Sequence, residues 1–271
     1  MNICKKNNIK TLFYWDDNFL KIPEEMIVAS SYYNDKNNKE RLKKILTQVN
    51  YIGISSEKLR EVSESYNKNV LKLPITIDFS IFKPTKNKKN CLKEKESFKI
   101  GYFGNLREKE FEIIFEVFLI LEKEFNNIQF EIFGLTSDKC YRIKNVNIIK
   151  PIFNYPEGIR KFVSLNWDIA LAPLIENDFN ECKTDAKYRD YATAKIPGIY
   201  SNISVYSQSV KHDITGVLVN NNVNDWYLGI KKLMLNSELR KKIMINAYLD
   251  VKEKYNLKKI TSEWNNIIEK L

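Results

Sequence analysis

The feature of this sequence that most constrains its fold is a regular alternation of strand-like and helix-like segments from Phe98 onward. The apolar run FKIGYF is followed by a helix-length segment over 108–125, and a second strand-like run, IQFEIFG, follows that segment. Strands separated by single helices build βαβ units, in which neighbouring strands run parallel. The alternation therefore predicts a doubly wound, Rossmann-like parallel α/β sheet.

The run WDIALAPL indicates where the centre of this sheet lies. It is apolar without the alternation of a strand that has one face in water, so we expect it to be buried on both faces. Further strands are expected in IPGIYS, in GVLV and over 146–149, and helices over 157–164, 184–194, 225–235 and 256–271. These elements together predict one domain over 98–271.

The chain before this domain alternates over a shorter length. Three strands and two helices are expected, in chain order over 11–15, 39–48, 51–54, 57–66 and 70–73. The stretch 85–97 is rich in Lys and Asn and has no apolar period. We therefore place the boundary there and expect a partial α/β segment with its linker over 1–84.

The charge balance limits the classes of partner. The chain has 44 Lys and Arg against 34 Asp and Glu, a net charge of +10, which attracts polyanions. Much of this excess is Lys scattered among Asn and Ile, which coding bias explains as readily as a basic binding surface. Nucleic-acid binding would need a basic patch interleaved with exposed aromatic residues, and the sequence shows none. We therefore expect no nucleic-acid partner.

The cysteines and the chain start indicate a cytoplasmic protein. The cysteines lie far apart and form no metal-ligand spacing. They are Cys4, Cys91, Cys140 and Cys182. No apolar stretch approaches the roughly 18 residues that a membrane span needs, and MNICKKNNIK lacks the apolar core of a signal peptide. Peripheral contact with an anionic membrane at its inner face stays open.

Two glycines flank the end of the first strand of the predicted domain. Ligands of doubly wound sheets bind beyond the carboxyl ends of the strands. Gly101 and Gly104 would let a phosphate approach backbone N–H groups near a helix start, with Asn105 and Arg107 as additional donors. A tight turn with solvated charges explains the same pattern about as well.

A second polar cluster surrounds the start of the predicted helix 184–194. Lys183 and Lys187 are spaced i, i+4, so they would lie one turn apart, and paired cations at a helix start suit a diphosphate. Asp190 would share that face and accept hydrogen bonds from ribose hydroxyls. Asn180 and Tyr188 lie beside these residues. An exposed helix with incidental charges is the competing interpretation.

The order of GYFGN, IFG, APL, DFNECKTDAKYRDYATAKIP and GVLV resembles the C-terminal domain of GT-B glycosyltransferases, with the greatest likeness to family 4-like enzymes. The resemblance covers roughly 71–271 and extends weakly upstream. It implies that this domain binds a nucleoside diphosphate sugar between the glycine turn and the lysine-bearing helix. Ile152 and Phe153 would flank the base.

The resemblance implies a hexosyltransferase-type enzyme, retaining and independent of metal or other cofactors, that transfers the sugar to a hydroxyl of a glycan or lipid-linked glycan. Asp190 matches the second glutamate of the family's E-x7-E motif, whereas the first falls near Cys182 or Lys183. The pattern K-x-x-x-K-x-x-E of some relatives fits instead, with Asp for Glu. This departure leaves sugar identity and stereochemical course open, and no residue is predicted as general base.

The short segment before the linker allows an alternative. Enzymes of this kind have a complete N-terminal domain that binds the acceptor, so the chain would be a fragment, a shortened protein, or half of an enzyme completed by a partner chain. A noncatalytic or partner-dependent donor-binding module is then the second hypothesis. Asp16 and Asp17 are adjacent rather than in a D-x-D metal motif, and we expect a turn or cap role for them. We expect His212 to have a loop role.

Overall fold

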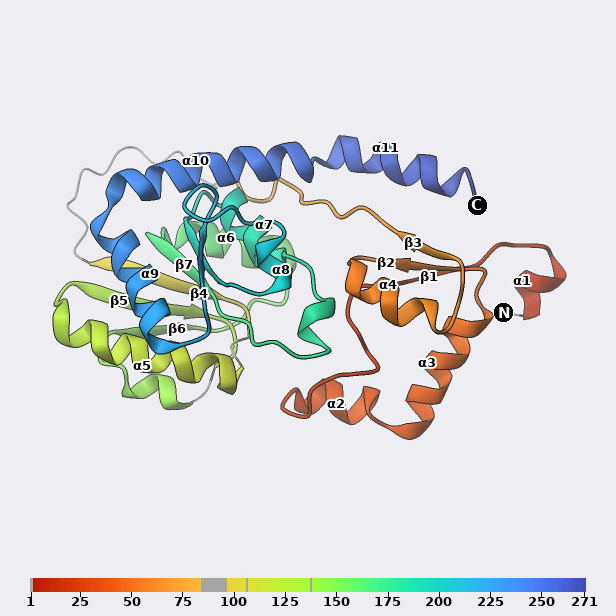
Figure 1. Cartoon of the computed structure of the whole chain (residues 1–271), viewed down its shortest axis with the longest axis horizontal. Coiled ribbons are helices and arrows are strands. Elements are labelled where there is room, and N and C mark those ends of the chain that lie inside the picture. Colours follow the sequence, from red (N-terminus) through yellow and green to blue (C-terminus); the bar gives the residue numbers. More distant parts are fainter. Residues whose placement is uncertain (1, 84–96, 106, 137) are drawn as a thin grey trace. The chain divides into compact units, whose positions relative to one another are not determined.

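The computed structural model describes residues 2–83, 97–105, 107–136 and 138–271 (Figure 1). Its backbone forms two compact units. The small unit comprises Met1–Thr76, Glu176–Thr184 and Leu257–Leu271, and the large unit comprises Ile77–Ile175 and Asp185–Asn256. Each unit contains its own parallel sheet, so each is described separately.

The large unit is built on a six-stranded parallel sheet with the order β6-β5-β4-β7-β8-β9. The strands are β4 (Phe98–Phe103), β5 (Ile128–Phe133), β6 (Val146–Ile149), β7 (Ile169–Ala172), β8 (Gly198–Ser201) and β9 (Val217–Val219). The order runs outward in both directions from β4 and β7, which is the doubly wound arrangement. The predicted fold class is confirmed, and all four residues of β7 are buried, as expected for a central strand.

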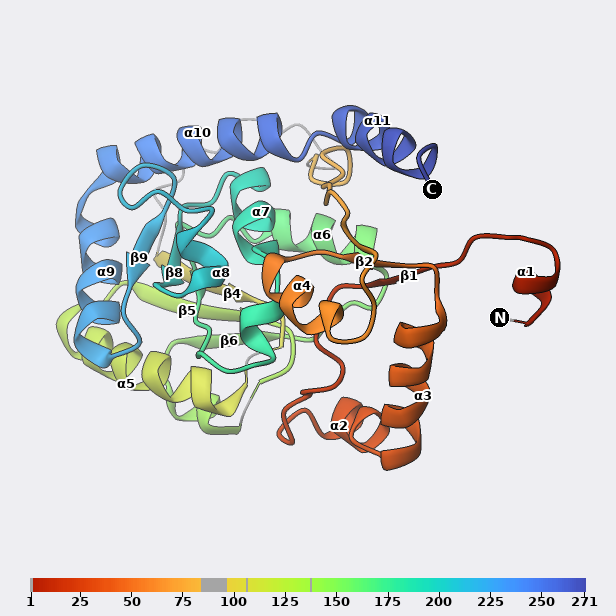
Figure 2. The same cartoon turned by 45° about the vertical axis from the view of Figure 1, so that its right-hand side comes forward.

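Helices cover both faces of the large sheet (Figure 2). They are α5 (Glu108–Glu124), α6 (Tyr155–Ser164), α7 (Ala186–Thr193), α8 (Ser204–Ser207), α9 (Val223–Leu235) and α10 (Ser237–Lys254), with the 3-10 helix η1 (Asp138–Arg142). The core of one face takes Phe118 from α5 and Trp226 from α9. The other takes Phe162 from α6, Tyr191 from α7 and Val251 from α10. The sheet is therefore the middle of three layers.

The small unit contains a three-stranded parallel sheet in the order β1-β2-β3. Its strands are β1 (Leu12–Trp15), β2 (Tyr51–Ile54) and β3 (Val70–Lys72). Its helices are α1 (Asn2–Lys6), α2 (Ile27–Tyr33), α3 (Lys36–Gln48), α4 (Glu57–Glu64), the 3-10 helix η2 (Asn180–Cys182) and α11 (Leu257–Ile268). The side chain of Ser56 accepts a hydrogen bond from the N–H of Leu59 and caps α4.

The two units differ from the predicted division at 1–84 and 98–271 in the placement of three segments. Residues 77–83 belong to the large unit, and 176–184 and 257–271 belong to the small unit. Long-range contacts explain the last of these, because the indole of Trp264 in α11 donates to the carbonyl of Pro74 at 2.9 Å. Its ring also lies edge-on to Tyr14.

Two predictions concern the membrane and the cysteines. Across the described residues, no helix is long and apolar enough to cross a membrane. Cys4, Cys140 and Cys182 are free thiols, and Cys91 lies outside the described residues.

Candidate functional site

The turns that follow β4 and β5 pack backbone against backbone. Gly104 has a φ of +121° and Gly134 a φ of +149°, conformations that side chains rarely allow. A Cβ atom on Gly134 would lie 1.9 Å from the carbonyl oxygen of Gly104. The amide oxygen Oδ1 of Asn105 also accepts a hydrogen bond from the N–H of Leu135. The end of β4 therefore depends on the glycine that follows β5.

Lys187 brings a positive charge to this turn. It lies in α7, and its Nζ donates to the carbonyl oxygen of Phe103 at 2.9 Å. The same ammonium lies 4.8 Å from the ring centroid of Tyr102 and 2.9 Å from the place that a Cβ on Gly104 would occupy. Lys187 therefore projects from α7 to the carboxyl end of β4, beside the glycine turn.

Gly101 has a different role from the one predicted. It lies within β4, paired in register with Glu131 of β5 and Ala170 of β7. A Cβ atom at this position would lie 1.8 Å from the ring of Trp167. The prediction that Gly101 exposes backbone to a phosphate is wrong, because its missing side chain makes room for a buried indole.

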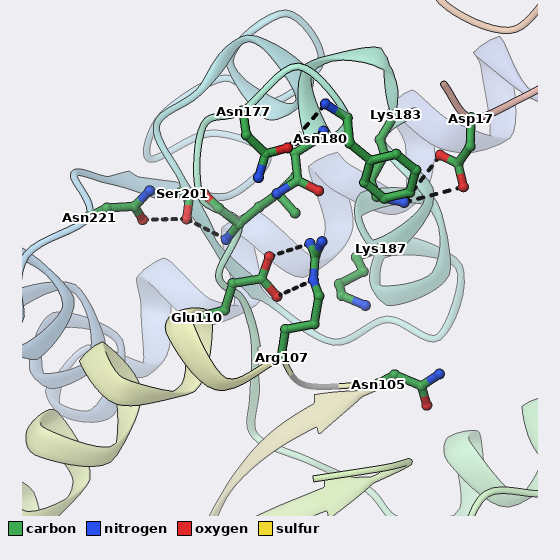
Figure 3. A network of polar contacts seen from close by, with 12 residues as sticks. Asp17, Asn105, Arg107, Glu110, Asn177, Asn180, Lys183, Lys187, Ser201 and Asn221 are labelled. Carbon is green, nitrogen blue, oxygen red and sulfur yellow. Dashed lines mark hydrogen bonds and ion pairs between the residues drawn. The ribbon is translucent and has the colours of Figure 1, made fainter. Parts of the chain in front are cut away.

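Arg107 immediately precedes α5 and is engaged by a carboxylate. Its Nε donates to Glu110 at 3.2 Å, and its second nitrogen also contacts this carboxylate, so the contact is bidentate (Figure 3). Burial raises the pKa of Glu110, and the charges of Arg107 and Lys187 oppose that rise. The positive charge of Arg107 is therefore balanced by a buried carboxylate, whereas Lys109 in the first turn of α5 is exposed.

Lys183 does not share a helix face with Lys187. The helix α7 begins at Ala186, and Lys183 has extended backbone with a ψ of 167°. Its Nζ instead lies 3.1 Å from the carboxylate of Asp17 and 4.2 Å from the ring centroid of Phe179, within the small unit (Figure 3). The predicted i, i+4 pair of cations is wrong.

The reason for the late helix start is the residue that precedes α7. Asp185 makes no side-chain cap. Its carboxylate instead accepts hydrogen bonds from the Nε of Arg189 at 3.0 Å and from the hydroxyl of Tyr255 at 2.6 Å. These contacts hold the start of α7 in the large unit, while Asn180, fully buried in η2, belongs to the small unit.

Two further predicted residues lie in α7. Tyr188 is fully buried and its hydroxyl donates to Asp250 of α10 at 2.8 Å, so the prediction that it faces a ligand is wrong. Burial raises the pKa of Asp190 to about 6, and the charges of Arg189 and Lys187 oppose this rise. Asp190 is therefore mostly ionised at pH 7 while it remains close to two cations.

Ile152 and Phe153 lie in the segment between β6 and α6. Ile152 is 38% exposed and Phe153 is 96% exposed, so Phe153 contributes almost nothing to the core. Because β6 runs parallel to β5 and β4, this segment follows the same carboxyl edge of the sheet as Gly104. An apolar ring that is open to solvent is available to stack on a planar ligand.

The remaining sequence candidates are structural. His212 accepts a hydrogen bond at Nδ1 from the N–H of Leu218, in agreement with a loop role. The carboxylate of Asp17 pairs with Lys183, and the backbone oxygen of Asp16 accepts a hydrogen bond from Ser55. Within the described residues, no group of three or more His, Cys, Asp or Glu could hold a metal ion.

Comparisons with known proteins identify the fold. No family model matches this sequence, and no curated protein does. HepE from Anabaena, solved with UDP-glucose, matches with a TM-score of 0.72 at 10% identity, over 99% of this chain and 74% of that chain. A TarM mutant from S. aureus, solved with fondaparinux, alpha-GlcNAc-glycerol and UDP, matches with a TM-score of 0.70 at 17% identity.

The TarM match covers 96% of this chain and 50% of TarM, so the chain spans about half the length of the TarM chains that it matches. The C-terminal domain of a glycosyl transferase group 1 family protein, LpcC from Francisella tularensis, matches with a TM-score of 0.54 at 20% identity. That match covers 67% of this chain and 99% of the domain. The chain therefore has the GT-B fold of nucleotide-sugar-dependent glycosyltransferases.

Sequence reasoning missed several residues at this edge of the sheet. Gly134 stood at the end of IQFEIFG, where a glycine after a predicted strand is a usable signal. Glu110 resembled an ordinary charge in the first turn of a helix. Ser201 and Asn221 carried no local signal, because their hydrogen-bond partners are distant in the chain.

Proposed function

We propose that this chain is a glycosyltransferase whose large unit binds a nucleoside diphosphate sugar beyond the carboxyl ends of β4 and β7. The observation that carries the proposal is the ammonium of Lys187 beside the backbone of Gly104. A cation next to a glycine turn, before the start of the long helix α5, suits a diphosphate. The sugar is transferred to a hydroxyl of a glycan or lipid-linked glycan.

The remaining parts of the donor have candidate contacts in the same unit. The carboxylate of Asp190, on the helix that carries Lys187, accepts hydrogen bonds from ribose hydroxyls. The exposed ring of Phe153, with Ile152 beside it, flanks the base. Lys187 stabilises the negative charge that develops on the leaving diphosphate, which is the main electrostatic demand of such a transfer. Asn105 supplies a polar contact at the turn.

A panel of UDP, GDP, ADP and CMP with their common sugar conjugates tests this proposal. A ligand that binds only the native state raises the melting temperature, and a shift with one base identifies the donor class. UDP is the first probe, because the HepE and TarM structures contain it. A wild-type protein that responds to none of these nucleotides would refute donor binding.

A donor-binding module without turnover is the second candidate. Cys182 lies near the position that the first glutamate of the E-x7-E motif would occupy. Burial raises the pKa of its thiol to about 11. A neutral buried thiol cannot replace a carboxylate toward sugar hydroxyls. Nucleotide binding with neither hydrolysis nor transfer by the isolated chain would favour this candidate, and release of free nucleoside diphosphate would exclude it.

A further inference from the structure

A run of hydrogen bonds through side chains ties together the ends of three strands in the large unit, and the proposed function assigns it no role. Ser201 is the last residue of β8, and its Oγ accepts a hydrogen bond from the N–H of Leu174 at 2.8 Å. The same hydroxyl donates to Oδ1 of Asn221 at 2.6 Å. Nδ2 of Asn221 then donates back to the carbonyl of Leu174 at 2.9 Å (Figure 3).

These bonds satisfy both polar backbone groups of a buried loop residue. Leu174 is 6% exposed and lies beyond β7, whose pairing with β8 ends at Ala172 and Tyr200. Buried backbone groups need partners, and here two side chains provide them where the ladder no longer does. Ser201 and Asn221 therefore set the position of the loop after β7.

Ile175, the residue after Leu174, links this hydrogen-bonded loop to the centre of the sheet. The N–H of Ile175 hydrogen-bonds to the carboxylate of Glu110, which is 2% exposed and also holds Arg107. The loop after β7 is thus joined to the start of α5, which follows β4. The neighbours β4 and β7 mark the point where strand order reverses, and ligands of such sheets bind there.

We propose that Ser201 and Asn221 are positioning residues for donor binding. They hold Leu174, so that Ile175 keeps its bond to Glu110 and the charges around Lys187 keep their arrangement. Neither side chain needs to touch the nucleotide. This inference rests on the proposed function. It adds two residues that belong neither to the glycine turn nor to α7 and that determine how well the donor site is preformed.

The variant Ser201→Ala tests the inference, with UDP as the probe in isothermal titration calorimetry. We expect its affinity for UDP to fall roughly fivefold, the size of one neutral hydrogen bond. Hydrogen–deuterium exchange of the peptide that contains Leu174 should rise in the same variant. Ser207→Ala, an exposed serine of α8, is the matched control and should change neither quantity. A fall in melting temperature alone would indicate a structural role only.

A second variant covers the case in which Ser201→Ala does not fold. Asn221→Asp keeps the acceptor for Ser201 and removes the donor to Leu174, so it should weaken UDP binding and raise the same local exchange. Faster exchange with unchanged UDP affinity in both variants would overturn the inference while the proposed function survives. If the wild-type chain binds none of the nucleotides in the panel, the proposed function fails first and the positioning role fails with it.

Discussion

Lys183 and Lys187 are four residues apart in the sequence, but their ammonium groups make different contacts. Lys183 pairs with Asp17 and lies over the ring of Phe179 in the small unit. Lys187 reaches the end of β4, where its Nζ donates to the carbonyl oxygen of Phe103. The difference arises because Asp185 and its partners begin α7 only after Lys183. Equal charge and helical spacing are therefore insufficient to define a shared site.

The largest expected effect comes from removing each of these charges in turn. Lys187→Met should weaken UDP binding about 10- to 100-fold, because a hydrogen bond to a charged group contributes about 1.5–3 kcal/mol. Lys183→Met should leave the dissociation constant for UDP within a factor of about 2. Calorimetric titration of both variants measures the contrast. Equal losses in the two variants would refute the distinction between these lysines.

Gly104→Ala tests the same contrast between the two units by changing the backbone turn that Lys187 contacts. The new methyl group would lie 2.9 Å from Nζ of Lys187, at a φ of +121°, so the turn and the ammonium must both shift. We expect UDP affinity to fall about tenfold, since strained backbone of this kind costs of order 1–3 kcal/mol. Gly53→Ala is the control in the small unit, where the methyl group would meet the side chain of Leu73. It should lower the melting temperature without changing the affinity for UDP.

The third prediction uses the carboxylate that shares α7 with Lys187. Burial raises the pKa of Asp190 from the ordinary 3.8 to about 6. The carboxylate therefore binds a proton more tightly in the native state than in the unfolded state. The stability linked to this group is present below about pH 4 and is lost as pH rises through 6. Asp190→Asn should therefore stabilise the protein at pH 7, by at most about 1 kcal/mol after discounting for solvent access.

Melting curves of the wild type and Asp190→Asn at pH 4.5 and pH 7 measure this effect. The difference in melting temperature should be positive at pH 7 and shrink toward zero at pH 4.5. A difference that stays constant between these two values would show that the carboxylate of Asp190 does not titrate there.

The fold was predictable from the sequence because its signals are local. The alternation of apolar segments from FKIGYF through GVLV indicates the lengths of the strands and helices directly. The burial of β7 is evident from its own apolar sequence, without information about the strands beside it. For the candidate site, the sequence indicated the edge of the sheet at which it lies but not the contacts of its individual residues. Asn105, Lys187 and Asp190 stay predictions as donor contacts, and so do Ile152 and Phe153, which follow β6.

The errors share one physical cause, which is contact between residues distant in sequence. The sequence around Gly101 does not reveal that the ring of Trp167 lies over it, and the sequence around Tyr188 does not reveal its hydrogen bond to Asp250. The segment 176–184 was assigned by continuity to the large domain. Its carbonyl at Cys182 accepts a hydrogen bond from Ser56 of the small unit at 2.7 Å, which no local pattern records.

The smallest expected effect concerns Asp17, the partner of Lys183. Both side chains are partly exposed, 31% for Asp17 and 26% for Lys183, and such ion pairs contribute little because water screens them. Asp17→Asn should lower the free energy of unfolding by about 0.5 kcal/mol or less. The affinity for UDP should not change, because the charge at the end of β4 is untouched.

Asp17→Asn is nevertheless the variant that tests most directly whether the two regions are independent. Segment 176–184 begins directly after Ile175, which bonds to Glu110, and ends directly before Asp185, which starts α7. If these two junctions transmit a change, a weaker hold on Lys183 alters the turn after β4, contrary to the expected independence. A change in UDP affinity in Asp17→Asn that disappears in the Lys183→Met background would demonstrate such coupling. The contrast between the two lysines would then describe two ends of one connected segment.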